Sequence, residues 1–391
     1  MEGGGQPPLT LIALLSAGNF VIGMGAFVVI GILGPIADGL DVPPARAGLV
    51  LTAYALAYAV GSPVGVAATG RLPRRLVMTS GLAIFAAAAL GAAFAPNFGT
   101  LLAARVLAAF GAGLFTPVTA AVAVSVTAPE RRGAALSNVF FGLTLAQVIG
   151  VPAGGVIAYA VGWQAAFLVV AALALPVLLG LWRLVPPALP FQATRLATLG
   201  ATLADRRAML SVLFTASFLG AIYVPFTYLG LILTATMGFG GPAIASALLV
   251  FGFGAVGGNL IGGLLADRIG ARRTLMGLAL AQITLMPLVS TLPLPPWSVY
   301  VLIFVRSLCG WSFLAPQQSV LIALAPERAS VMLALNAAAI YVGAAAGSAI
   351  GAEVIDRAGL GALGVAGGLC GVAALANLLA AFRVRSRTEP G

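Results

Sequence analysis

The sequence predicts an all-α membrane protein of twelve transmembrane helices, arranged as two pseudo-symmetric six-helix bundles. Three observations lead to this prediction: an apolar composition, long apolar runs between short charged breaks, and an internal repeat. Of the 391 residues, 61% are hydrophobic and 8% are charged, whereas a soluble domain has about 45–50% apolar and about 25% charged residues. Lipid must therefore be the solvent for most of the chain.

The apolar runs are long enough to cross a bilayer, which takes roughly 20 residues of helix. Read between charged or Pro- and Gly-rich breaks, they predict helices over 9–35, 47–69, 76–95, 100–125, 134–161, 165–184, 209–234, 243–266, 274–292, 298–323, 330–354 and 361–382. The longest polar break is 185–208. We therefore expect an N-terminal bundle over 1–184, a cytoplasmic linker over 185–208 and a C-terminal bundle over 209–391.

Arginine sets the expected orientation. All 20 basic residues are arginine, and most lie in the breaks between apolar runs. With the N-terminus inside, only Arg46 and Arg357 lie in outer loops, as the positive-inside rule requires. We expect both termini to be cytoplasmic, in a bacterial-type plasma (inner) membrane. This distribution argues against nucleic acid as a partner, although the net charge is +10.

The two halves of the chain resemble each other. Ala-Pro-Glu-Arg at 128–131 recurs at 325–328, a shift of 197 residues, and the same shift places Gly150 on Gly347, Gly154 on Gly351 and Gly162 on Gly359. Two six-helix halves in parallel orientation are typical of secondary transporters, which bind substrate near the membrane midplane. Because a fold does not fix a function, this step is an analogy from architecture.

The loop after the eighth predicted helix resembles the signature of the major facilitator superfamily. Gly263 to Arg273 reads GLLADRIGARR, similar to G-x-x-x-D-R-x-G-R-R with one residue inserted. We expect Asp267 to accept hydrogen bonds from helix amides and to pair with loop arginines, forming a cytoplasmic latch. The alternative is that these charges only set topology.

Other stretches resemble the efflux branch of this superfamily. The first-half loop from Gly65 has Thr69 at the Asp position and ends GRLPRR, as in arabinose-, purine- and chloramphenicol-efflux transporters. The stretch from Ile149 to Phe167 is similar to the antiporter motif of drug/proton antiporters. The resemblance implies conformational roles for Gly65, Arg74, Arg75, Gly150, Pro152, Gly154, Gly263, Asp267, Arg268 and Arg272.

A substrate cavity should be lined by polar and aromatic side chains at mid-depth. The candidates are Asn19, Tyr58, Phe115, Gln147, Tyr223, Phe226, Asn259, Trp311, Gln317 and Tyr341. Ordinary helix packing is the alternative for each of them. Arg105 and Arg306 lie inside predicted helices, where a charge costs roughly 3 kcal/mol and is functional by default. We expect them to pair with backbone carbonyls or to contact substrate. The alternative is that both, lying near the outer ends of their spans, extend their charged ends to the outer interface.

Acids are scarce at membrane depth. The resemblance implies an acidic residue in the first helix for proton coupling, but that position falls on Ala26, and the chain has no histidine. Asp38, Glu353 and Asp356 lie near outer helix ends and are the remaining coupling candidates. Proton antiport is therefore implied by the family without the expected residue.

The sequence favours a monomeric transporter that exports a small neutral or aromatic molecule, such as a drug, nucleobase, nucleoside or sugar. Its partners would be substrate, the lipid bilayer and, with antiport, protons. An uncoupled facilitator or uptake carrier is the first alternative, and a non-transporting receptor or scaffold is the second. No nucleophile–base pair, metal-ligand cluster or phosphate-binding loop occurs in the sequence, so we expect no enzyme activity, metal or cofactor.

Overall fold

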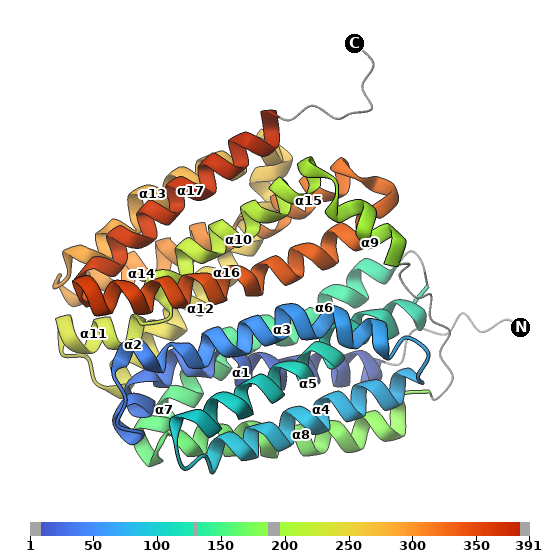
Figure 1. Cartoon of the computed structure of the whole chain (residues 1–391), viewed down its shortest axis with the longest axis horizontal. Coiled ribbons are helices and arrows are strands. Elements are labelled where there is room, and N and C mark those ends of the chain that lie inside the picture. The colour runs from blue at the N-terminus through green and yellow to red at the C-terminus, as the bar shows by residue number, and fades with distance from the viewer. Residues whose placement is uncertain (1–8, 129–130, 187–195, 384–391) are drawn as a thin grey trace, which may run out of the picture. The chain divides into compact units, whose positions relative to one another are not determined.

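The computed structural model describes residues 9–128, 131–186 and 196–383, and within these ranges it is helical, without a strand (Figure 1). They contain 12 helical stretches that are long and apolar enough to cross a membrane. The predicted all-α fold with twelve membrane spans is confirmed. Glu130 of the repeat, 187–195 of the linker and both chain ends lie outside the described residues.

The chain divides into two compact units. Unit 1 comprises Met1–Pro43, Ala53–Ala193 and Gly241–Leu249, and unit 2 comprises Pro44–Thr52, Thr194–Gly240 and Val250–Gly391. The helices that lie wholly or mostly in unit 1 are α1 (Leu9–Gly39), α3 (Leu49–Ala68), α4 (Arg74–Ala93), α5 (Phe98–Ser125), α6 (Arg132–Leu145), α7 (Val151–Val161) and α8 (Trp163–Leu184). The domain boundaries expected from the sequence remain predictions.

Unit 2 contains the second set of long helices. Its helices are α2 (Pro44–Ala47), α9 (Leu196–Leu203), α10 (Arg206–Phe226), α11 (Leu229–Met237), α12 (Gly241–Ile269), α13 (Ala271–Leu285), α14 (Pro296–Trp311), α15 (Leu314–Leu324), α16 (Ala329–Ala358) and α17 (Leu363–Arg383). The first turns of α12 belong to unit 1 and the first turn of α3 to unit 2. Several spans are built from two helical pieces: Arg206–Met237 consists of α10 and α11, and Pro296–Leu324 consists of α14 and α15.

The fifth span consists of two helices, α6 and α7, joined by an irregular turn. Between α6 and α7 the backbone makes one π-helical turn over Ala146–Gly150, where the N–H of Val151 donates to the carbonyl oxygen of Ala146. Pro152 follows directly and has no N–H to donate. The π turn widens the helix next to the proline, and such turns are frequent at functional sites.

Two side chains that the sequence reading missed tie the segment Pro44–Thr52 into unit 2. The Tyr228 hydroxyl donates to the carbonyl oxygen of Ser348 at 2.9 Å, and the Ser348 hydroxyl donates to that of Gly48 at 2.9 Å. A Cβ on Gly48 would collide with the Tyr228 hydroxyl, so this position needs glycine. No sequence motif marks these residues, because a lone Tyr or Ser in an apolar helix carries no pattern.

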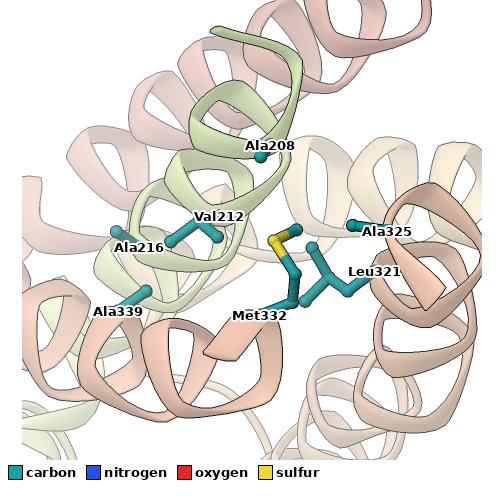
Figure 2. Packing of buried hydrophobic residues seen from close by; sticks show 7 residues of the cluster. All are labelled: Ala208, Val212, Ala216, Leu321, Ala325, Met332 and Ala339. Atoms are coloured by element: carbon teal, nitrogen blue, oxygen red, sulfur yellow. The ribbon is translucent and has the colours of Figure 1, made fainter. Parts of the chain in front are cut away.

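Four alanines, a valine, a leucine and a methionine form a buried cluster in unit 2 where α10, α15 and α16 meet. Figure 2 shows Met332 reaching from α16 towards Val212 of α10 and Leu321 of α15. The full cluster is Ala208, Val212, Ala216, Leu321, Ala325, Met332 and Ala339. Alanines let the helices approach closely, and the flexible methionine fills the remaining gap.

Candidate functional site

Arg105 is buried in unit 1 with its charge satisfied by the backbone. The side chain is 2% exposed; Nη1 donates to the carbonyl oxygen of Gly25 at 2.6 Å and Nη2 donates to that of Ala26 at 2.8 Å. The Tyr54 ring covers the guanidinium, with its centroid 4.4 Å from the guanidinium carbon. Arg105 therefore takes the carbonyl-pairing role that the sequence left as one of two options.

The carbonyl pairing depends on glycine at position 25. A Cβ there would lie 2.6 Å from Cζ of Phe85 and 2.9 Å from Cγ1 of Val170. Phe85, Val170 and Arg105 line one small, mostly apolar cavity together with Phe167 and several alanines. The position aligned with the family's first-helix acid, Ala26, thus offers Arg105 its main-chain oxygen instead of a carboxylate.

Asn19 belongs to a buried polar contact between three helices of unit 1. Its amide nitrogen donates to the Thr119 hydroxyl at 3.1 Å and to the carbonyl oxygen of Val139 at 3.2 Å. Asn19 and Thr119 are both fully buried. The contact joins α1, α5 and α6 and places Asn19 in helix packing, the alternative that the sequence left open.

Gln317 lies in the corresponding contact of unit 2. Its amide nitrogen donates to the carbonyl oxygen of Ser211 at 2.7 Å and to the Thr215 hydroxyl at 3.1 Å, and that hydroxyl donates to Oδ1 of Asn336 at 2.6 Å. All three side chains are buried. The sequence reading missed Thr215 and Asn336.

The two polar contacts are copies of each other under the internal repeat. A shift of 197 residues places Val139 on Asn336, and a shift of 198 places Thr119 on Gln317. Asn19 falls on Ala216, next to Thr215, at the shift of 197. Each unit therefore joins its first, fourth and fifth spans through a buried hydrogen-bonded group. The amide donor lies on the first span in unit 1 (Asn19) and on the fourth span in unit 2 (Gln317).

Arg306 is the repeat counterpart of Arg105, but its surroundings differ. Its side chain is 4% exposed, and within the described residues it has no hydrogen bond, ion pair or ring contact. It lies on the buried face of α14 with Val299, Ile303 and Gly310. The repeat thus preserves the buried charge and changes its environment.

Three of the aromatic candidates, Tyr58, Tyr223 and Phe226, are buried and make ring contacts. Tyr58 stacks on Tyr54 with centroids 6.4 Å apart, and Phe226 stacks on Phe251 at 3.9 Å. Tyr223 lies edge-on to Phe226, Phe115 packs against Gly18, and Trp311 is buried. Three further candidates are half-buried: Gln147, Asn259 and Tyr341. Within unit 2 the structure therefore brings Tyr223 and Phe226 together.

Gly150 and Gly154 allow α1 to pack closely on the π turn and α7. A Cβ on Gly150 would lie 3.1 Å from Cβ of Met24, and one on Gly154 would collide with Cγ2 of Val28. Their repeat counterparts behave alike in unit 2. A Cβ on Gly347 would collide with the carbonyl oxygen of Gly220, and one on Gly351 would lie 2.8 Å from that of Val224. Both units thus pack their first helix on a glycine stripe of their fifth.

The first-half loop makes short local contacts. A Cβ on Gly65 would lie 2.8 Å from Cδ2 of Leu114, and the Thr69 hydroxyl donates to the carbonyl oxygen of Gly65 at 2.7 Å. Arg74 is buried and donates to the carbonyl oxygen of Gly70 at 2.8 Å. The Arg75 guanidinium carbon lies 4.2 Å from the centroid of the Trp182 ring, a cation–π contact between α4 and α8.

The second-half loop repeats the cation–π contact but not the expected latch. The guanidinium carbon of Arg272 lies 4.3 Å from the centroid of the Phe382 ring, so α13 meets α17 as α4 meets α8. Gly263 is half-buried, while Asp267 and Arg268 are exposed. Across the described part of the chain Asp267 has no hydrogen bond or ion pair. The helix-amide and arginine partners expected for it are absent from this conformation, and its latch role stays a prediction.

The three coupling candidates are exposed. Glu353 accepts from Arg357 four residues later, and these side chains are 58% and 79% exposed, respectively. Asp38 and Asp356 are exposed as well. Among the described residues no Asp or Glu is buried, and no group of three or more His, Cys, Asp or Glu could hold a metal ion. These positions favour solvated helix ends over buried proton carriers.

Comparison with known proteins decides the family. The sequence matches the Major Facilitator Superfamily over residues 15–330 and 250–391. The chain belongs to this superfamily. The inner membrane transport protein YdhP of Escherichia coli (strain K12) is 32% identical and covers 96% of both chains. A chloramphenicol resistance protein of Streptomyces lividans is 31% identical and covers 97% of both.

A solved Major Facilitator Superfamily structure has the same fold. A bacterial homolog to the human lysosomal transporter Spinster, in an inward-facing and occupied conformation, matches with a TM-score of 0.76 and 17% identity over 98% of both chains. At that identity the likeness establishes the fold. The resemblance to the superfamily and its efflux branch, inferred from the loop and antiporter motifs, is confirmed. The chain is a multi-pass membrane protein of a transporter family.

Proposed function

We propose that this superfamily member exports a small neutral or aromatic molecule by alternating access. The observation that carries the proposal is the duplicated glycine packing, in which Gly150 and Gly154 lie against α1 and Gly347 and Gly351 lie against α10. Small residues let two helix backbones approach closely, so in each half the first and fifth spans pack tightly together. Two halves built in this repeated way could rock against each other as rigid bodies, which is how alternating access works in transporters of this architecture.

Export and the substrate class are supported by sequence likeness. The Streptomyces relative is named for resistance to chloramphenicol, a small uncharged aromatic compound. The efflux-type stretch from Ile149 to Phe167 begins within the π turn and includes Pro152, so the motif overlaps an unusual local structure. Tyr223, Phe226 and Phe251 give unit 2 a buried aromatic group of the kind that would accept such a ligand.

Proton antiport is the proposed energy source, and an uncoupled facilitator is the alternative. Family likeness supports antiport. The exposed positions of Asp38, Glu353 and Asp356, and the carbonyl pairing of Arg105 at Ala26, favour the facilitator. Purified protein in liposomes loaded with radiolabelled chloramphenicol separates them. Antiport predicts that an imposed pH gradient drives label against its concentration gradient, whereas equal flux with and without the gradient would favour the facilitator.

The remaining parts of the proposal concern placement in the cell. We place the protein in the bacterial inner membrane as a monomer with both termini cytoplasmic, supported by the arginine distribution and by the name of the Escherichia coli relative. A green fluorescent protein fused after Gly391 should fluoresce, while alkaline phosphatase fused there should be inactive. The opposite pattern would place the C-terminus outside.

A further inference from the structure

The buried hydrogen-bonded group of unit 2 holds two side-chain amides next to each other. The Thr215 hydroxyl lies between them, 3.1 Å from Nε2 of Gln317 and 2.6 Å from Oδ1 of Asn336. The other polar atom of each amide, Oε1 of Gln317 and Nδ2 of Asn336, has no hydrogen bond to any described residue. The group therefore keeps one unused acceptor and one unused donor.

The two unused atoms are not sealed inside the packing. The side chains of Gln317 and Asn336 are 1% and 2% exposed. In the described chain several unpaired polar atoms are fully enclosed, for example Oδ1 of Asn19, but Oε1 of Gln317 and Nδ2 of Asn336 are not among them. Both atoms thus retain a little accessible surface, and a small molecule can reach them.

The group lies at the depth where a transporter of this architecture binds substrate. Thr215 is nine residues past the start of α10, Gln317 is seven before the end of α15, and Asn336 is seven past the start of α16. At about 1.5 Å per residue, this is roughly 10–14 Å from those helix ends, near the middle of a hydrocarbon core about 30 Å thick. The apolar cluster in Figure 2 lies one turn closer to the same ends.

Unit 1 does not repeat this arrangement. Val139 stands at the repeat position of Asn336, and the unpaired Oδ1 of Asn19 is enclosed. The repeat therefore preserves the packing role of the group, and unit 2 adds a reachable acceptor and a reachable donor. Polar groups at membrane depth are costly, so their default interpretation is functional.

We propose that Gln317 and Asn336 bind an amide group of the transported molecule. Oε1 of Gln317 would accept the N–H of the ligand, and Nδ2 of Asn336 would donate to its carbonyl oxygen. The hydrogen bonds within the group involve only uncharged atoms, which favours a neutral ligand over an ion. The inference rests on the proposed transport function and narrows its substrate class to small neutral amides that retain an N–H.

Ligand-dependent thermal stabilisation of the full chain in detergent tests this site without requiring transport. The probes are two pairs: 2-pyridone with N-methyl-2-pyridone, and benzamide with N,N-dimethylbenzamide. The members of a pair share a ring and a carbonyl oxygen, and methylation removes the N–H. Each protein is compared with its own melting temperature without ligand, so a less stable variant remains informative.

The variants of the site are Gln317→Met and Asn336→Leu, and two controls accompany them. Gln282→Met makes the same change at a buried glutamine of α13 whose amide atoms are fully enclosed. Arg183→Gln removes an exposed arginine from α8. The two site variants alter different helices, and the comparison of paired ligands in wild type stands even if neither variant folds.

The proposal expects each N–H compound to raise the melting temperature more than its methylated partner in wild type and both controls. Gln317→Met should raise the concentration of the N–H compound for half-maximal shift by roughly three- to tenfold and remove its advantage, because one hydrogen bond is lost. Asn336→Leu should weaken both members of a pair, because both keep the carbonyl oxygen.

Equal shifts within both pairs in wild type, including no shift at all, would overturn the proposal. An unchanged response to the N–H compounds in both Gln317→Met and Asn336→Leu would also overturn it and leave the two amides with a structural role. Export of chloramphenicol could still be observed in either case, so failure of this site is distinguishable from failure of the proposed function.

Discussion

The Arg105 guanidinium donates to the carbonyl oxygens of Gly25 and Ala26, at 2.6 and 2.8 Å. This pairing gives the buried charge a main-chain counterpart on α1. We predict that Arg105→Met lowers the free energy of unfolding by about 2–4 kcal/mol, because two carbonyls in the core lose donors that carry charge. Tryptophan fluorescence during heating in detergent measures it, and Arg183→Gln should stay within about 0.5 kcal/mol of wild type.

The glycine stripes predict a graded response to alanine. Gly347→Ala should destabilise unit 2 most, because the added Cβ would collide with backbone at Gly220. In Gly154→Ala the added Cβ would collide with a side-chain methyl group of Val28 and not with backbone, so the cost should be smaller. Gly155→Ala is the matched control, since its Cβ would have one neighbour, the carbonyl oxygen of Gly31 at 3.8 Å. Equal melting temperatures for the three variants would contradict this account of the packing.

The buried hydrogen bonds of unit 2 should behave as one group. Thr215→Val leaves Oδ1 of Asn336 and the Gln317 amide short of a partner, so it should cost about 1–3 kcal/mol. Combining it with Asn336→Leu should cost less than the sum of the single changes, because the second change removes the atom that the first left unpaired. Additive effects, measured by thermal unfolding, would mean that the two side chains do not interact.

Sequence reasoning identified the architecture because apolar runs and loop arginines are long-range, redundant signals. The repeat also carried local information. Gly162 and Gly359, placed in register by the shift of 197, both have positive φ, 104° and 78°, at the turn before the last span of each half. Glycine adopts such backbone angles without a steric penalty.

The repeat was less informative where the hydrogen-bonding side chains lie on different helices in the two units. The repeat aligns Asn336 with Val139, so the two halves share no polar residue at this position that could have indicated it. The sequence does hold one indication of Asn336: a shift of 198 aligns two polar residues, Thr119 and Gln317. A search for polar residues on the neighbouring helices would then have led to Asn336. Arg75 and Arg272 show the limit of motif matching as well. The loop signature aligns Arg74-Arg75 with Arg272-Arg273, while the ring contacts pair Arg75 with Arg272.

Asp267 allows stability and transport to be separated. The side chain is exposed and unbonded within the described residues, so Asp267→Asn should leave the melting temperature nearly unchanged. If the loop forms a latch in another conformation of the cycle, the same variant should slow export of chloramphenicol from loaded liposomes. Normal export would refute the latch and restore the view that these charges only set topology.

Glu353 gives a test of coupling. Its pair with Arg357 is exposed, so Glu353→Gln should change stability by less than about 1 kcal/mol. A helix-end carboxylate that carries no proton for transport can be neutralised without losing the response to a pH gradient. Loss of that response in Glu353→Gln, with the melting temperature preserved, would instead identify this carboxylate as the coupling group.

Counterflow tests the central claim, that this chain is a carrier that alternates its access, most directly. Liposomes containing the protein are loaded with an excess of an unlabelled compound that stabilises it on heating, and the labelled compound is added outside. An alternating-access carrier exchanges the two, so label should accumulate transiently above its outside concentration, with or without a pH gradient. A compound that binds and stabilises the protein yet gives no such accumulation would contradict the claim and favour a receptor or scaffold.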